Sequence, residues 1–318
     1  MGKNFYLKLS FFVLLFIGTY FFVVHQLSQG YVDVYYPKFT QRAESLIIGL
    51  SRGHDGISPD VIAAELDSFP MARPLINFAF DKYQSPYGEI YLEGIAKKIG
   101  ENTEDGLFIL TLSPGGFTIP GKMDDDAILK MDKKMIMGKL SDFHSNPNYN
   151  YIVKCYAQSL YAVYNRNNLF ENQVTHPNGW NEIKVYTEES EISEADMKHW
   201  KSLTLRGYEQ IMKKEKISAY RIRHFAKTLT FLKERGTVLM VRLPSDPDII
   251  ALENAYWSNF SEQMDSISKA HKVPFFDYTK QLHAYKTYDG SHLVSRSAVE
   301  FSKRLGGDIR AYLKEQNN

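Results

Sequence analysis

Two short segments at opposite ends of the chain carry residues that can do acid–base and nucleophilic chemistry together. Near the C-terminus, the sequence Tyr-Asp-Gly-Ser-His-Leu places Asp289 three residues before His292, in a Gly/Ser turn just ahead of a helix. Such a turn can aim both side chains at one point, where the carboxylate orients the imidazole and stabilises its protonated form. His292 can then act as a base toward a hydroxyl group.

The hydroxyl that we consider first is that of Ser51. An apolar run of strand length, residues 45–49, stops at a glycine, and the serine follows two residues later. Ser58 and Pro59 then begin a helix, with an N-cap residue and a proline at the first helical position. A strand, a tight turn, a serine and a helix together present a hydroxyl at the carboxyl edge of an α/β sheet, where ligands bind.

Apolar runs and amphipathic segments alternate along most of the chain, which predicts a parallel sheet with helices on both faces. The expected strands cover residues 45–49, 75–80, 107–112, 237–243 and 273–277. The expected helices cover residues 59–67, 87–99, 219–235, 247–271 and 296–315. Residues 117–205 interrupt this pattern, and we interpret them as an inserted region with a helix near 151–165 that forms a lid over the active edge.

The N-terminus predicts a membrane anchor. Leu9 to Val24 contains no charge, and the apolar segment from Phe5 to Leu27 has the length that crosses a bilayer. Lys3 and Lys8 precede most of this segment. By the positive-inside rule, we expect residues 1–27 to form an anchor whose N-terminus is cytoplasmic, and the rest of the chain to be exported. No small-residue cleavage site follows, which favours an uncleaved signal anchor. We expect a stalk at 28–44 and one domain at 45–318.

Composition excludes several classes of protein. A net charge of +1 argues against a nucleic-acid partner held by bulk electrostatics. The single cysteine, Cys155, excludes an intramolecular disulfide and the usual cysteine-based zinc sites. The histidines show no metal-ligand spacing, so we expect no metal and no cofactor. The acidic triplet at 124–126 lacks the alternating spacing of a calcium loop and is interpreted as a solvated helix start.

Taken together, Gly49-Leu50-Ser51 near the start of the domain and Asp289-Gly290-Ser291-His292 before the last helix resemble the SGNH/GDSL hydrolase superfamily. The resemblance covers roughly residues 45–116 and 236–312 and implies a flavodoxin-like, three-layer fold. With the anchor, the chain is most similar to the membrane-anchored extracytoplasmic branch, which includes D-alanyl transfer and alginate O-acetylation proteins.

By position, the resemblance implies that Ser51 is the nucleophile, His292 the general base and Asp289 its orienting acid. The oxyanion hole of that family uses the N–H of the nucleophile, a glycine after the second strand and an asparagine after the third. Neither of the last two occurs here, and Gly115 and Gly116 are the glycines that can offer N–H groups instead.

Five further side chains lie near the predicted edge. Arg52 either binds an anionic substrate or forms a surface ion pair. Asn77, inside the second strand, either bonds to the backbone or contacts substrate. Arg242 ends the fourth strand and is either structural or substrate-binding. His54 and Asp55 are a second candidate base pair, although adjacent side chains usually point apart.

We therefore expect a single-pass periplasmic enzyme, an esterase or O-acyltransferase that acts on an acylated glycan or lipid of the cell envelope. A transferase of this kind implies a membrane partner that supplies acyl groups. The alternative is a catalytically inactive protein of the same fold, which binds glycan or a membrane partner. A structural subunit that docks a partner through residues 117–205 is a third possibility.

Overall fold

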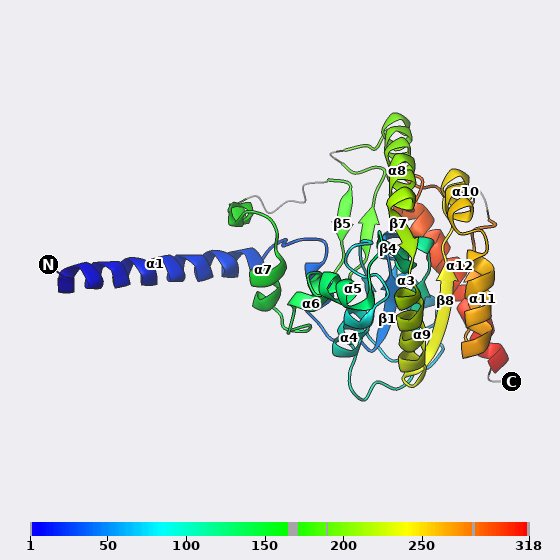
Figure 1. The fold of residues 1–318 in the computed structure, drawn as a ribbon, viewed down its shortest axis with the longest axis horizontal. Coiled ribbons are helices and arrows are strands. Elements are labelled where there is room, and N and C mark those ends of the chain that lie inside the picture. Colours follow the sequence, from blue (N-terminus) through cyan, green and yellow to red (C-terminus); the bar gives the residue numbers. More distant parts are fainter. Residues whose placement is uncertain (1, 165–170, 189, 282–283, 317–318) are drawn as a thin grey trace.

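A sheet of five parallel strands forms the centre of the protein. The computed structural model describes residues 2–164, 171–188, 190–281 and 284–316 (Figure 1). The strand order is β2-β1-β3-β8-β9, and every neighbouring pair is parallel. The strands are β1 (Ser45–Gly49), β2 (Leu75–Ala79), β3 (Gly106–Thr111), β8 (Gly236–Arg242) and β9 (Phe275–Asp277). Because β1 lies between β2 and β3, the chain reverses its direction across the sheet there, and a topological switch point results.

Alternate residues of each strand enter two hydrophobic cores, one on each face of the sheet. Leu46 and Ile48 of β1 belong to one core, and Ile47 between them belongs to the other. All residues of β1, β2 and β3 are buried. Strands that are covered on both faces need continuous apolar runs, which explains why the sequence predicted these strands within one or two residues of their ends.

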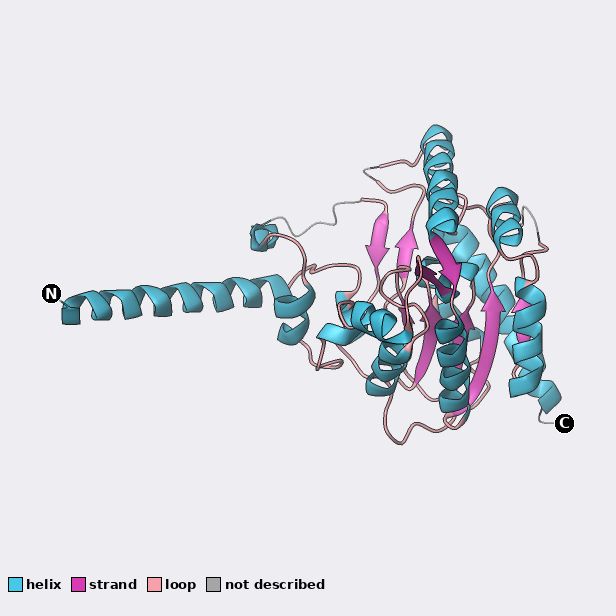
Figure 2. Cartoon of the chain, viewed as in Figure 1, coloured by secondary structure: helices cyan, strands magenta, loops and turns pink. Residues whose placement is uncertain are grey.

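Helices cover both faces of the sheet (Figure 2). On the first face lie α4 (Glu89–Lys98), α9 (Ala219–Lys233) and α11 (Phe260–His271). On the second lie α3 (Pro59–Glu65) and α12 (Ser295–Gln316), with α2 (Ser51–Gly56) packed against α12. The single helix predicted over 247–271 is two helices, because α10 (Pro247–Tyr256) ends where Trp257 leaves the helical backbone and packs against Phe117 and Phe260.

The first helix, α1 (Gly2–Ser28), is long and apolar enough over Asn4–Ser28 to cross a membrane. Most of it projects away from the domain (Figure 1). Val24 and Leu27, however, are buried in the core on the first face of the sheet, which we call the first core. The stalk predicted over 28–44 is wrong. Val32 and Phe39 are buried in the same core, and residues 36–39 form the short helix η1 (Tyr36–Phe39), so this segment is part of the domain.

The predicted insertion contains much more regular structure than the sequence suggested. Two small antiparallel sheets join β4 (Thr118–Pro120) to β7 (Glu215–Ile217) and β5 (Gln173–Thr175) to β6 (Asn181–Ile183). The short helix η2 (Pro114–Phe117) leads into it, and its helices are α5 (Asp125–Asp132), α6 (Ile136–Lys139), α7 (Tyr149–Cys155), η3 (Leu160–Tyr164) and α8 (Glu194–Lys214), the last of which runs past residue 205.

Three predictions for this region have clear outcomes. The helix expected at 151–165 is instead α7 and η3, and residue 165 lies outside the described residues. The expected boundary at 205 falls inside α8, which continues to Lys214. The acidic triplet does begin a helix: the Asp124 side chain accepts from the Ala127 N–H and caps α5, as predicted.

Candidate active site

A continuous chain of hydrogen bonds links Asp289, His292 and Ser51. The Ser51 Oγ lies 2.7 Å from His292 Nε2, and His292 Nδ1 lies 2.8 Å from Asp289 Oδ2. Two segments separated by 241 residues therefore meet at one point. This is the arrangement in which a histidine can remove a proton from a serine hydroxyl while a carboxylate fixes the orientation of the ring.

The turn after β1 directs the serine into this position. Gly49 has φ +130°, and a Cβ atom there would lie 2.1 Å from Thr111 Oγ1 and 2.5 Å from the Thr111 carbonyl oxygen. Only glycine therefore fits between β1 and β3. Leu50 is the N-cap of α2 and Ser51 is its first residue. The expected serine turn is thus the start of a short helix, whose first N–H groups have no intrahelical acceptor.

The Asp289 turn orients the base. Asp289 Oδ1 accepts from the backbone N–H groups of Ser291 and His292, and Oδ2 accepts from the imidazole. Gly290 provides a positive φ of +86° in the turn. Thr204 of α8 also donates to Asp289 Oδ2, at 3.3 Å. The aspartate is therefore fixed from both its own loop and the inserted region.

Charges within the pair shift both pKa values. Burial opposes ionisation of Asp289, but its attraction to His292 and its hydrogen bonds from His292 and Ser291 outweigh burial and lower its pKa to about 2. Burial also disfavours the imidazolium form of His292, but the Asp289 carboxylate raises its pKa to about 9. At neutral pH the resting pair is therefore an ion pair, and His292 becomes a base as the pH rises.

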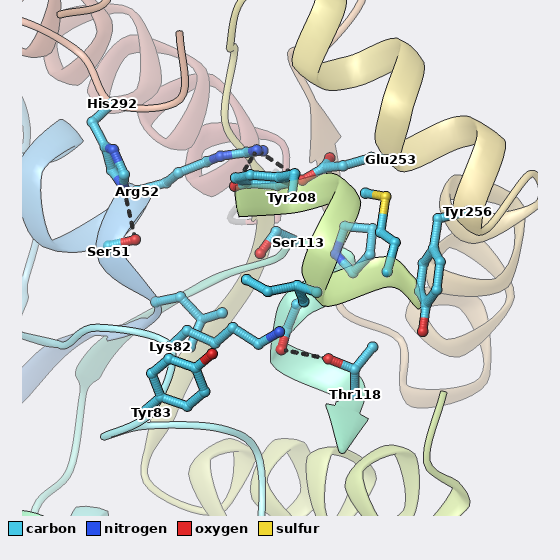
Figure 3. A pocket seen from close by; sticks show the side chains of 15 residues that line it. Ser51, Arg52, Lys82, Tyr83, Ser113, Thr118, Tyr208, Glu253, Tyr256 and His292 are labelled. Atoms are coloured by element: carbon cyan, nitrogen blue, oxygen red, sulfur yellow. Dashed lines mark hydrogen bonds and ion pairs between the residues drawn. The ribbon is translucent and has the colours of Figure 1, made fainter. Parts of the chain in front are cut away.

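Ser51 and His292 open into a mostly apolar cavity of about 170 Å³, which we call the first cavity (Figure 3). Its walls come from the ends of strands and from α8. It is lined by Leu50, Ser51, Arg52, Lys82, Tyr83, Ser113, Pro114, Gly115, Thr118, Tyr208, Ile211, Met212, Glu253, Tyr256 and His292. The switch point between β1 and β3 therefore carries both the hydrogen-bonded triad and a cavity beside it.

The charged residues of the first cavity are paired. Arg52 is buried and donates to Glu253 Oε1 at 2.7 Å, while Arg242 donates to Glu253 Oε2 at 3.0 Å. Arg52 is therefore a buried member of an ion-pair network that lines the first cavity, and not the surface ion pair considered from the sequence. Arg242 joins the same network and does not line the cavity. Lys82 pairs with Glu215 of β7.

The two glycines after β3 differ in what they can offer to an oxyanion. The Gly116 N–H donates to the Ser113 carbonyl at 3.0 Å, so the tight turn of η2 already uses it. Gly115 lines the first cavity, and none of the hydrogen bonds among the described residues uses its N–H. Gly115 and the Ser51 N–H are therefore the candidate oxyanion donors, and Gly116 is removed from that group.

Asn77 supports the site from beneath. Its side chain is fully buried and donates to the backbone carbonyl groups of Gly53, His54 and Ile57 at 2.8 to 3.3 Å. Asn77 lines neither of the cavities beside Ser51. Asn77 therefore holds α2 in place. Of the two roles considered from the sequence, hydrogen bonding to the backbone is the one observed, and contact with substrate is not.

A second cavity, of about 280 Å³, also opens at Ser51 and His292. It is lined by Val34, Tyr35, Ser51, His54, Asp55, Asp81, Gln173, Asn181, Ile183, Tyr288 and His292. The Asp55 carboxylate accepts from Asn181 Nδ2 at 2.8 Å and from the Tyr288 hydroxyl at 3.0 Å, and not from His54. Burial raises the pKa of Asp55 to about 6 against the opposing attraction of His292. The second candidate base pair is therefore not formed.

Sequence reasoning missed the walls of both cavities. Asn181 of β6 belongs to the inserted region that we expected over 117–205, and Tyr208 of α8 lies just beyond its expected boundary. The capping box between Ser193 and Asp196 was a signal for α8, since a Ser with an acidic residue three positions later often begins a helix. No local signal marks Asn181, whose role depends on a contact with α2.

No three His, Cys, Asp or Glu side chains in the described part of the chain are grouped so that they could hold a metal ion. Comparison with known proteins matches no family model and no curated protein.

Proposed function

We propose that this protein is a membrane-anchored serine esterase or O-acyltransferase of the SGNH/GDSL type, with the flavodoxin-like three-layer fold that this type implies. The observation that carries the proposal is the hydrogen-bonded chain from Asp289 through His292 to Ser51. The strand order gives further support, because it corresponds to the doubly wound order 2-1-3-4-5 and Ser51 follows the strand at its switch point.

The reaction proceeds through a covalent intermediate. Neutral His292 takes the proton of the Ser51 hydroxyl as Oγ attacks an ester carbonyl carbon. The N–H groups of Ser51 and Gly115 stabilise the negative charge on the carbonyl oxygen. The carbon–oxygen bond to the leaving alcohol then breaks, and His292 returns the proton to that alcohol. Water or a second alcohol removes the acyl group from Ser51 in the reverse sequence.

The first cavity suits the acyl group. Its lining is mostly apolar, and the guanidinium of Arg52 and the ammonium of Lys82 are each paired with a glutamate. A neutral acyl chain is therefore favoured there, because an apolar lining gives a charged acyl group little compensation for its lost hydration.

The length and apolar composition of α1 support a location at a membrane. We propose that α1 crosses the bilayer with Lys3 and Lys8 on the cytoplasmic side, so that the domain lies in the periplasm beside envelope glycans and lipids. A membrane partner that supplies acyl groups fits a transferase at this location.

The test is a fluorophosphonate probe, which reacts with activated serine hydroxyl groups, applied to the full-length protein in detergent. Wild type should be labelled, while Ser51→Ala and His292→Ala should not. Ser266→Ala is the matched control, because this serine is exposed on α11 and its hydroxyl donates to the Glu262 carbonyl, away from the site. It should be labelled like wild type. Absence of labelling in folded wild type would reject the enzyme and leave the inactive, glycan-binding protein as the better hypothesis.

A further inference from the structure

The two cavities beside the triad share only Ser51 and His292, and their chemistry differs. The first is mostly apolar, as described above. The second is bordered by carboxylate, amide and phenol groups from α2, from the end of β2, from the β5–β6 hairpin and from the 288–292 loop. A group in one cavity and a group in the other would therefore both approach the same hydroxyl and the same imidazole.

Asp55 is one of the carboxylates that line the second cavity. It lies four residues after Ser51 on α2, which is one helical turn, so both side chains are on the same side of the helix. Each Asp55 oxygen accepts one hydrogen bond, from Asn181 and from Tyr288. A carboxylate oxygen can accept a second one. The site therefore retains acceptor capacity for O–H groups.

Other groups of this cavity also suit a hydroxylated ligand. Asp81 accepts a hydrogen bond from Tyr35 and is exposed. His54 is buried, and its Nδ1 has no hydrogen-bond partner among the described residues. The Tyr288 ring stacks on His292 with 5.7 Å between ring centroids. Polar acceptors next to aromatic rings are a typical environment for a sugar, which offers O–H donors on its edge and C–H groups on its faces.

Charge restricts the ligand further. Two carboxylates, Asp55 and Asp81, line this cavity, and no lysine or arginine is among its described lining residues. A uronate or a phosphate group placed there would be repelled, whereas a neutral polyol would not.

We propose that the second cavity is the acceptor site and that the protein transfers its acyl group to a hydroxyl of a neutral polyhydroxylated compound. This inference rests on the proposed function. In the transfer step the acceptor O–H gives its proton to His292 and its oxygen attacks the carbonyl carbon of acyl-Ser51. The bond between that carbon and Ser51 Oγ breaks, Oγ takes the proton from His292, and a new ester is released.

The experiment uses the full-length protein in detergent with 4-nitrophenyl acetate as donor. Glycerol and methyl β-glucoside are the neutral acceptors, and methyl β-glucuronide is the charged one. Release of 4-nitrophenol reports acylation of Ser51, and mass spectrometry measures each acetylated acceptor. We expect acetyl transfer to methyl glucoside to exceed transfer to the glucuronide by about tenfold, the effect of one nearby charge at intermediate dielectric.

Removal of either carboxylate should reduce this preference. Asp55→Asn and Asp81→Asn should each lower the glucoside-to-glucuronide ratio several-fold, and the exposed Asp81 serves as the second variant in case the buried substitution impairs folding. Asp60→Asn removes an exposed carboxylate from α3 and should leave the ratio unchanged. Two outcomes would reject the acceptor site but not the proposed esterase activity. In the first, 4-nitrophenol is released but no neutral acceptor is acetylated. In the second, the glucoside-to-glucuronide ratio is unchanged in both Asp55→Asn and Asp81→Asn. If no 4-nitrophenol is released, the proposed function fails and this inference fails with it.

A second, independent observation concerns the domain surface beside α1. The short helix η3 packs against α1 (Figure 1). Val163 of η3 joins Val24 and Tyr20 in the first core, whereas Tyr161 and Tyr164 are 74% and 78% exposed. The uncharged run of α1 ends at Val24, and Tyr20 lies four residues before that end. Since Val163 packs in the same cluster as both residues, η3 lies beside the C-terminal end of the uncharged run.

We infer that Tyr161 and Tyr164 lie in the headgroup region of the bilayer that α1 crosses, where tyrosine is enriched because its ring is apolar and its hydroxyl is polar. The chain has one cysteine, so nitroxide labels can be placed singly in a Cys155→Ser background. The labelled variants are Gly18→Cys in α1, Tyr161→Cys, Tyr164→Cys and the exposed, distant Tyr186→Cys.

In lipid vesicles, electron paramagnetic resonance should show Gly18→Cys protected from an aqueous relaxant and accessible to oxygen. The labels at 161 and 164 should be intermediate, and the label at 186 should be open to the aqueous relaxant. Labels at 161 and 164 that match position 186 would reject the inference while leaving the anchor intact. A label at position 18 that is open to the aqueous relaxant would reject both.

Discussion

Arg52, the residue after the candidate nucleophile, forms a buried ion pair with Glu253 at 2.7 Å. The other carboxylate oxygen of Glu253 accepts from Arg242 at the end of β8. One glutamate on α10 therefore pairs with two buried guanidinium groups and ties α2 to the sheet. Arg52 also donates to Ser291, between Asp289 and His292, so the same network joins both ends of the triad.

Glu253→Gln should destabilise the protein by about 3–5 kcal/mol, since removing one partner leaves buried charges without compensation. The measurement is the free energy of unfolding in urea, followed by tryptophan fluorescence. Glu300→Gln breaks the exposed pair with Arg296 and should cost at most about 0.5 kcal/mol. Equal effects of the two substitutions would contradict the role assigned to Glu253.

The rate of fluorophosphonate labelling should increase from pH 7 to about pH 9. The pKa of His292 is raised to about 9, so the imidazole is protonated and unable to accept a proton below that pH. Asp289→Asn removes the charge that raises the pKa, so the rise should move to lower pH while the maximal rate falls on the order of 10²–10⁴-fold. Labelling that is independent of pH would show that His292 is not the base.

The same pair links stability to pH. The folded-state pKa of His292 is above its ordinary value of 6.5, so its contribution to the free energy of unfolding is complete below about pH 6.5 and is lost as the pH rises through about 9. Urea unfolding at pH 6 and pH 10 should show this loss in wild type, and the loss should be smaller in His292→Gln.

Gly49→Ala should destabilise the protein by about 2 kcal/mol or more, because it adds both strain at a positive φ and a clash with Thr111. Gly207→Ala is the control. This glycine lies in α8 with nothing within 4 Å of the added methyl group, and the substitution should stabilise the helix by about 0.5–1 kcal/mol. Thermal unfolding of both variants tests the pair, and a tolerated alanine at position 49 would refute the steric argument.

Deletion of residues 1–27, which gives a chain that begins at Ser28, should lower the free energy of unfolding even in the absence of a membrane. Val24 and Leu27 are 0% and 2% exposed, and full burial of each such side chain contributes about 1.5–3 kcal/mol. A chain that begins at Tyr20 keeps both contacts and should unfold at higher urea concentration than one that begins at Ser28. Identical midpoints would mean that the end of α1 does not belong to the core.

The sequence alone predicted the elements whose signals are local. The five strands were visible because a parallel sheet buried on both faces needs uninterrupted apolar runs. Helix α1 was visible as a long uncharged run, which has the length and composition to cross a bilayer. The Asp289–His292 pair was also visible, since a single turn positions both residues. Tertiary structure decided everything that depends on distant contacts. It brought Ser51 within hydrogen-bond distance of His292 and paired Arg52 with Glu253. It also packed residues of the 28–44 segment, which the sequence predicted as a stalk, into the core. It also joined Asn181 to Asp55, which completed a polar cavity beside Ser51. Such contacts join segments far apart in the chain, and their energies depend on packing and burial that no short stretch of sequence encodes.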